Sequence, residues 1–148
     1  MKFLFIVLFY LLIKISLVAS ENLYSPYSVD LNNLSASRPS GLDEGDPKKG
    51  KKIFISRRVN CLSCHAAPIP EERFQGNVGP SLYGIGKRYN KDEIRIRVID
   101  SKLLNPMTIM PSYHKKLSYP RIDKSFFNKK ILSAEEVEHL VEYLYSLK

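Results

Sequence analysis

The pentapeptide Cys61-Leu62-Ser63-Cys64-His65 is the most informative stretch of this chain of 148 residues. Its C-x-x-C-H spacing is typical of covalent haem attachment. Two thiols three residues apart on one helical turn can reach the two vinyl groups of a single porphyrin, and the adjacent histidine is then directed at the iron. The pentapeptide therefore predicts one haem c, attached through Cys61 and Cys64, with His65 as an axial ligand.

Two other kinds of site use the same three residues. A thioredoxin-like dithiol requires a βαβ context, which the pattern of this chain lacks. A zinc site requires a fourth ligand, for which only His114 and His139 offer a nitrogen. No second paired spacing accompanies the cysteines. A non-haem metal-binding or dithiol module stays open as an alternative of another class.

Residues 1–20 have the pattern of a secretory signal peptide. Lys2 precedes an apolar run that ends at Ile13, and no acidic residue occurs before Glu21. We expect cleavage before Glu21, and hence a periplasmic protein, because Lys14 makes a retained membrane-spanning helix too short. The chain would contact a membrane only if this segment were retained.

The charge and the cysteine count narrow the possible partners. The formal net charge is +8, and the only two cysteines belong to the pentapeptide, so none is left for a long-range disulfide. The lysines are too dispersed to predict a nucleic-acid partner. Acidic protein surfaces are the expected partners of such a basic chain.

The pattern divides the remaining chain into an arm and one domain. Residues 21–44 are rich in Ser, Asn and Pro and keep no period, which predicts a flexible N-terminal arm. Residues 45–148 form the expected domain. Its first helix starts at Asp46-Pro47, a cap followed by a residue suited to the first helical position, and runs to about Arg57. Gly50 in this helix would let another helix approach closely.

Two further helices are predicted by capping boxes. Positions 90–93 provide one, although the apolar alternation at positions 94, 96 and 98 equally suits a short strand. Ser133 opens the other, and apolar residues follow at helical spacing to the chain end. His139 is expected on the solvated side of this last helix.

Prolines and glycines between His65 and Tyr89 predict a long loop. Three to four helices joined by long loops have little core of their own, and a haem would fill it. We therefore expect an all-α domain wrapped around one covalent haem. A carbonyl near Gly79-Pro80 could accept a hydrogen bond from the far nitrogen of His65 and fix the orientation of its ring.

Met107 and Met110 compete for the second axial position, since a thioether favours Fe(II) and raises the potential. Met110 precedes Pro111, which favours an extended backbone able to present the sulfur to a haem face. We predict Met110 as the ligand and Met107 as a gap-filler beside the porphyrin. His114 is a weaker candidate ligand and is expected at the surface. Three tyrosines are candidate donors to the haem propionates: Tyr83, Tyr89 and Tyr113.

Taken together, these stretches resemble the small mono-haem cytochromes c, and among them the SoxX family, the small subunits of SoxXA complexes in sulfur oxidation. The resemblance covers roughly residues 45–148. It rests on Gly50 and on five longer stretches: Asn60–His65, Gly76–Leu82, Ile94–Asp100, Asn105–Tyr113 and Ile131–Lys148. Two positions depart from the family pattern: Met107 stands where an acidic or small residue is usual, and Asn128 where glycine is usual. Asparagine is the next best residue for a left-handed backbone.

The resemblance implies a cytochrome c fold, thioethers at Cys61 and Cys64, and axial ligation by His65 and Met110. SoxXA complexes join thiosulfate to a cysteine thiol of a carrier protein, and the reactive haem is assigned to the larger, SoxA-like cytochrome subunit. This chain would then be a non-catalytic electron-transfer subunit in a heterodimer with that cytochrome, delivering electrons to a further cytochrome. The alternative is a free-standing periplasmic electron shuttle.

Overall fold

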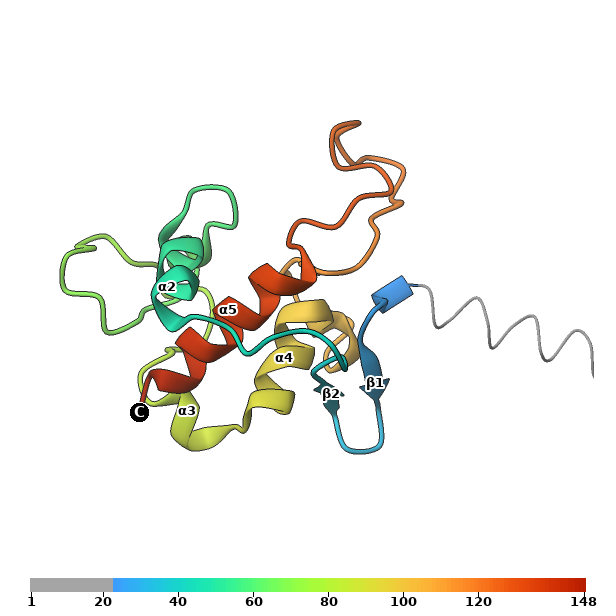
Figure 1. The fold of residues 1–148 in the computed structure, drawn as a ribbon. Coiled ribbons are helices and arrows are strands. Elements are labelled where there is room, and N and C mark those ends of the chain that lie inside the picture. The colour runs from blue at the N-terminus through green and yellow to red at the C-terminus, as the bar shows by residue number, and fades with distance from the viewer. Residues whose placement is uncertain (1–22) are drawn as a thin grey trace, which may run out of the picture.

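The computed structural model describes residues 23–148, so the predicted signal peptide lies outside the described residues. Within the described part, four α-helices and one small hairpin are joined by long loops (Figure 1). The predicted all-α class with three to four helices is confirmed. Among these residues, no helix has the length and apolar character needed to cross a bilayer.

Helices α2 (Pro47–Ile55) and α5 (Ala134–Ser146) pack against each other, although they lie at opposite ends of the domain sequence. The Asp46 carboxylate caps α2 by accepting the amide of Lys48 at 2.7 Å. A Cβ atom on Gly50 would lie only 1.9 Å from the carbonyl oxygen of His139. The predicted close helix approach at Gly50 is therefore confirmed, and α5 is the helix that approaches.

Helix α4 (Lys91–Asp100) begins with the predicted capping box between Asn90 and Glu93. The structure therefore selects the helix over the strand. Its apolar positions Ile94, Ile96, Val98 and Ile99 are all buried, because α5 covers one part of its circumference and strand β2 covers another (Figure 1). A helix surrounded on several sides loses the single apolar stripe that identifies most surface helices.

The segment that was predicted to be a flexible arm folds onto the domain instead. Strands β1 (Ser28–Asp30) and β2 (Ser35–Ser37) form an antiparallel hairpin, with Val29 opposite Ala36. Asp30 closes its turn by accepting the amide of Asn32 at 2.9 Å. Strands of three residues are too short to display a period in the sequence, which is why the pattern gave no sign of them.

Short elements position the loops. The 3-10 helices η1 (Cys61–Ser63) and η2 (Ser101–Leu103) and the short helix α3 (Ile85–Arg88) were not predicted. The long loop before α5 contains Asn128, whose φ of 55° lies in the left-handed region. The expectation that asparagine replaces glycine there for conformational reasons is confirmed.

Candidate haem site

A cavity of about 450 Å³ lies in the domain, and all three residues of the haem-attachment motif line it. Its apolar walls come from all four α-helices, through Phe54, Ile85, Ile94, Val98, Leu140 and Leu144. The lining is mostly apolar, as expected for a site that takes a large flat hydrophobic group. The hydrophobic core of the domain thus surrounds a cavity.

Helix η1 brings the pentapeptide to this cavity in a single turn. The amide of His65 donates to the carbonyl of Cys61 at 3.0 Å, and Asn60 starts the turn with a left-handed φ of 56°. Leu62 is buried in the core while Ser63 points to solvent, so Cys61 and Cys64 are left to face the cavity. The spacing of the motif therefore places both thiols at one cavity, and their attachment to a haem stays a prediction.

The imidazole of His65 is oriented by the following loop. Its Nδ1 atom lies 2.7 Å from the carbonyl oxygen of Pro80, which makes Nδ1 the protonated donor and leaves Nε2 free for a metal. A Cβ atom on Gly79 would lie 2.4 Å from Cε1 of the same ring. The predicted carbonyl acceptor near Gly79-Pro80 is confirmed, and glycine is needed there because the backbone touches the ring.

Only one of the two candidate methionines reaches the cavity. Met110 is half-buried and contributes to the lining, with its carbonyl held by the Ser101 hydroxyl at 3.2 Å. Met107 is 87% exposed and lies outside the lining. The prediction that Met107 fills a gap beside the porphyrin is therefore wrong, while Met110 and His65 share one cavity. Iron ligation by Met110 stays a prediction.

Comparison with known proteins assigns this chain to a family. The model of the family described as "Cytochrome c" matches residues 47–148. The chain belongs to the cytochrome c family. A solved structure, "Crystal structure of SoxXA from P. pantotrophus", contains a chain similar to this cytochrome at 26% identity with a TM-score of 0.73; the match covers 82% of this chain and 94% of that chain.

Family membership makes this protein an electron-transfer protein with covalent haem c, and the residues of the site fit that cofactor. Two free thiols, an oriented imidazole and a thioether line one apolar cavity. Sequence reasoning missed two cationic residues in the same lining, Arg88 and Arg97. Guanidinium groups are suitable partners for the propionates of a haem.

Tyr113 was one of the predicted donors to the haem propionates, but its hydroxyl is bonded within the fold. It is buried, and its hydroxyl donates to the carbonyl of Val59 at 3.0 Å, so it is used within the fold. The Arg97 guanidinium lies 3.8 Å from the ring centre of Tyr89, which holds that cation beside the cavity. Tyr83 is 55% exposed, and its carbonyl accepts from Arg88 at 2.6 Å.

The two other histidines are not where the sequence predicted them. His114, expected at the surface, is 2% exposed, and its ring nitrogens lie 2.9 Å from the Leu132 carbonyl and 3.1 Å from the Ser25 carbonyl. Burial is the main cause of its lowered pKa. His139, expected in solvent, is 9% exposed and accepts the Asp46 amide at 2.8 Å. His139 is buried against the start of α2 and His114 against the N-terminal segment, and both contacts join residues that are far apart in the sequence.

These positions remove support from the non-haem alternatives. Within residues 23–148, no group of three or more His, Cys, Asp or Glu side chains is arranged to hold a metal ion, and the ring nitrogens of both His114 and His139 are engaged elsewhere. Burial raises the pKa of the Cys61 thiol to about 11. Reactive dithiol centres depend on a lowered thiol pKa, and the shift at Cys61 is in the opposite direction.

Proposed function

We propose that this cytochrome is the electron-accepting subunit of a SoxXA-type complex, in which thiosulfate is joined to a cysteine thiol of a carrier protein. The observation that carries the proposal is the similarity to a chain of the SoxXA structure over 94% of that chain. The matched 82% of this chain exceeds the part covered by the cytochrome c family model. The similarity therefore includes residues ahead of Pro47.

The residues of the site suit electron transfer rather than substrate activation. Cys61 and Cys64 would hold the haem by thioethers, and His65 and Met110 would bind its iron. The haem supplies one-electron oxidation and reduction. The Pro80 carbonyl holds the His65 ring in place, and the apolar walls would limit the access of water to the iron of a bound haem.

The chemistry of the complex defines what this subunit must accept. Joining thiosulfate to a thiol forms one sulfur–sulfur bond and releases a proton and two electrons. A single haem takes one electron at a time, so this chain would accept and pass on two in succession. We propose a larger SoxA-like cytochrome as the electron donor and heterodimer partner, another cytochrome as the acceptor, and the periplasm as the location. The signal-peptide pattern of residues 1–20 supports that location.

Reconstitution tests the proposal. The ferric holoprotein is mixed with a larger SoxA-like cytochrome and the carrier protein, thiosulfate is added, and reduction is followed by haem absorbance. We expect a stable one-to-one complex and reduction that requires all three added components. Equally fast reduction by an unrelated cytochrome, without a stable complex, would instead make the chain a free electron shuttle.

The axial ligand needs its own test. Replacing Met110 by Ala should abolish the weak long-wavelength absorption that a methionine–iron bond gives a ferric haem. Met107→Ala is the matched control, because Met107 lies outside the cavity. A band that survives in Met110→Ala and disappears in Met107→Ala would reverse the assignment.

A further inference from the structure

The loop between η2 and α5 contains a surface that electron transfer does not explain. Residues 115–130, here called the basic loop, carry six basic side chains and one acidic side chain. In Figure 1 this segment, drawn in orange, extends away from the helices. None of its residues lines the haem cavity, so it does not take part in holding the haem.

Four cations of the basic loop are exposed and lack a counter-ion. Among the described residues, no ion pair involves any of them: Lys116, Arg121, Lys124 and Lys129. In contrast, Lys115 pairs with the buried Asp100 at 3.1 Å, and thus fixes the start of the loop. The one acidic side chain, Asp123, accepts the amide of Ser125 at 2.8 Å within its own turn. The loop therefore presents uncompensated positive charge.

Three aromatic side chains of the basic loop are exposed beside these cations. Tyr119, Phe126 and Phe127 have 46%, 42% and 57% of their surface in solvent. The loop is closed at its base, since the amide of Asn128 donates to the carbonyl of Leu117 at 2.7 Å and Leu117 itself is buried. Its two limbs are thereby held together, so the exposed rings and cations belong to one closed loop.

We propose that the basic loop binds the surface of an anionic phospholipid bilayer. The cations would contact lipid phosphates, and the aromatic rings would enter the interfacial layer, where amphipathic and aromatic side chains are favoured. A lipid surface fits better than an acidic protein because lysine, which provides three of the four free cations, is depleted in protein interfaces. The loop would hold the electron-transfer domain at a membrane surface independently of residues 1–20.

The test is sedimentation of exported holoprotein with vesicles, with the bound fraction measured by haem absorbance. We expect binding to vesicles of phosphatidylcholine with 30% phosphatidylglycerol and little to pure phosphatidylcholine. Each lysine near an anionic surface strengthens binding by about fivefold. Lys124→Gln combined with Lys129→Gln should therefore weaken it by about 25-fold.

Matched variants distinguish the loop from net charge. Lys48→Gln with Lys52→Gln removes the same charge from exposed positions of α2 and should change binding by less than about threefold, since screened charges act only over a Debye length. Phe126→Ser with Phe127→Ser should abolish the binding that persists at high salt, whereas Phe74→Ser, at a site 93% exposed, should not. Unchanged melting temperatures would show that the variants fold.

Three results would overturn the proposal. Equal weakening of vesicle binding by the two loop substitutions (Lys124→Gln, Lys129→Gln) and by the two α2 substitutions (Lys48→Gln, Lys52→Gln) would mean that only net charge matters. Binding without a preference for phosphatidylglycerol would remove the role of the cations. Failure to bind vesicles, together with a loop pair that weakens association with the larger cytochrome, would assign the surface to a protein partner.

Discussion

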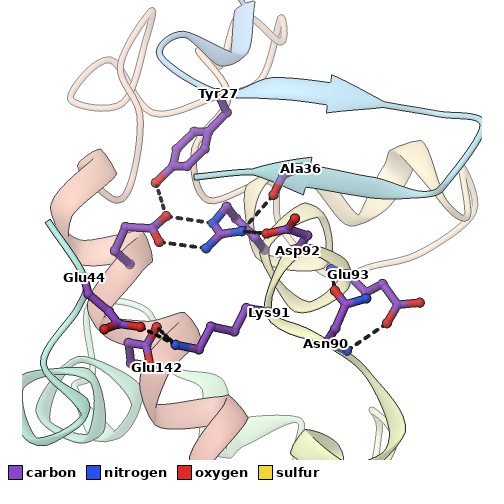
Figure 2. A network of polar contacts seen from close by, with 10 residues as sticks. Tyr27, Ala36, Glu44, Asn90, Lys91, Asp92, Glu93 and Glu142 are labelled. Carbon is purple, nitrogen blue, oxygen red and sulfur yellow. Dashed lines mark hydrogen bonds and ion pairs between the residues drawn. The ribbon is translucent and has the colours of Figure 1, made fainter. Parts of the chain in front are cut away.

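The buried ion pair between Arg95 and Glu138 anchors the N-terminal hairpin, and its removal gives a quantitative test of the fold. The side chains are 2% and 1% exposed, and they form two bonds, Nε to Oε1 at 2.8 Å and Nη2 to Oε2 at 2.9 Å. The Tyr27 hydroxyl donates to Glu138 at 2.9 Å, and Arg95 donates to the Ala36 carbonyl at 2.8 Å. Figure 2 shows that the hairpin and helices α4 and α5 meet at this cluster.

Replacing Glu138 by Ala should destabilise the holoprotein strongly. Removing one partner of a buried ion pair costs about 3–5 kcal/mol, because the other charge is left in a site without water. Asp92 still contacts Arg95, so we expect the lower end, about 3 kcal/mol. For a domain of this size, that corresponds to a fall of roughly 10 °C in the melting temperature. Tyr27 keeps a second acceptor, the Ala134 carbonyl at 2.9 Å, and adds no further cost.

Guanidinium unfolding followed by helical circular dichroism measures this cost. Glu71→Ala is the matched control: Glu71 pairs with Lys51 at the surface, where both side chains are 40% or more exposed, so its removal should change the stability little. Arg95→Leu with Glu138→Leu should recover part of the loss, since no charge is then buried alone. If Glu138→Ala cost no more than Glu71→Ala, the pair would not hold the hairpin.

Two further predictions concern the cavity and the acid stability. Gly79→Ala should displace the His65 ring, because a Cβ atom would lie 2.4 Å from Cε1, and the ferric absorption spectrum should shift toward a high-spin form. For Asp100, burial raises the pKa, but hydrogen bonds from Ser112 and Tyr24 lower it overall. The carboxylate therefore stabilises the fold above its unfolded pKa, about 4, and this contribution is lost as the pH falls through the lower folded pKa. Asp100→Asn should lower stability at pH 7 and flatten its acid dependence in pH-dependent unfolding curves.

Clear results would contradict either prediction. An unchanged ferric spectrum in Gly79→Ala would mean that the loop moves to accommodate the new Cβ atom while the His65 ring stays in place. Gly79 would then not be a positioning residue. An acid dependence as steep in Asp100→Asn as in the parent protein would place the protonating group elsewhere. Asp43→Asn, at an exposed position, is the matched control for the second measurement.

The parts of this protein that could be predicted from sequence have local causes. Haem attachment by Cys61, Cys64 and His65 depends on five consecutive residues, and η1 presents them in one turn. Both capping boxes form as predicted, because a cap and its partner are three residues apart. The choice of Met110 over Met107 as the residue at the cavity followed from the proline after it.

The features that were missed have partners far away in the sequence. His114 is buried because the carbonyl of Ser25, 89 residues earlier, lies against it. The hairpin is held by Arg95 through the Ala36 carbonyl, 59 residues away. Arg95 stands among the apolar residues of α4, and this was the one sign in the sequence of a buried polar contact, since arginine is buried only when it is paired. The pattern did not identify its partner.

The position of α4 and α5 explains why a small electron-transfer domain carries the hairpin. Both helices present apolar side chains to the haem cavity, through Ile94 and Val98 on α4 and Leu140 on α5. They also hold the buried Arg95 and Glu138, which bond to the Ala36 carbonyl of the hairpin and to the Tyr27 hydroxyl, respectively. The hairpin and the cavity wall thus share these two helices. Loss of the Arg95–Glu138 pair should therefore disturb the haem site as well as the hairpin.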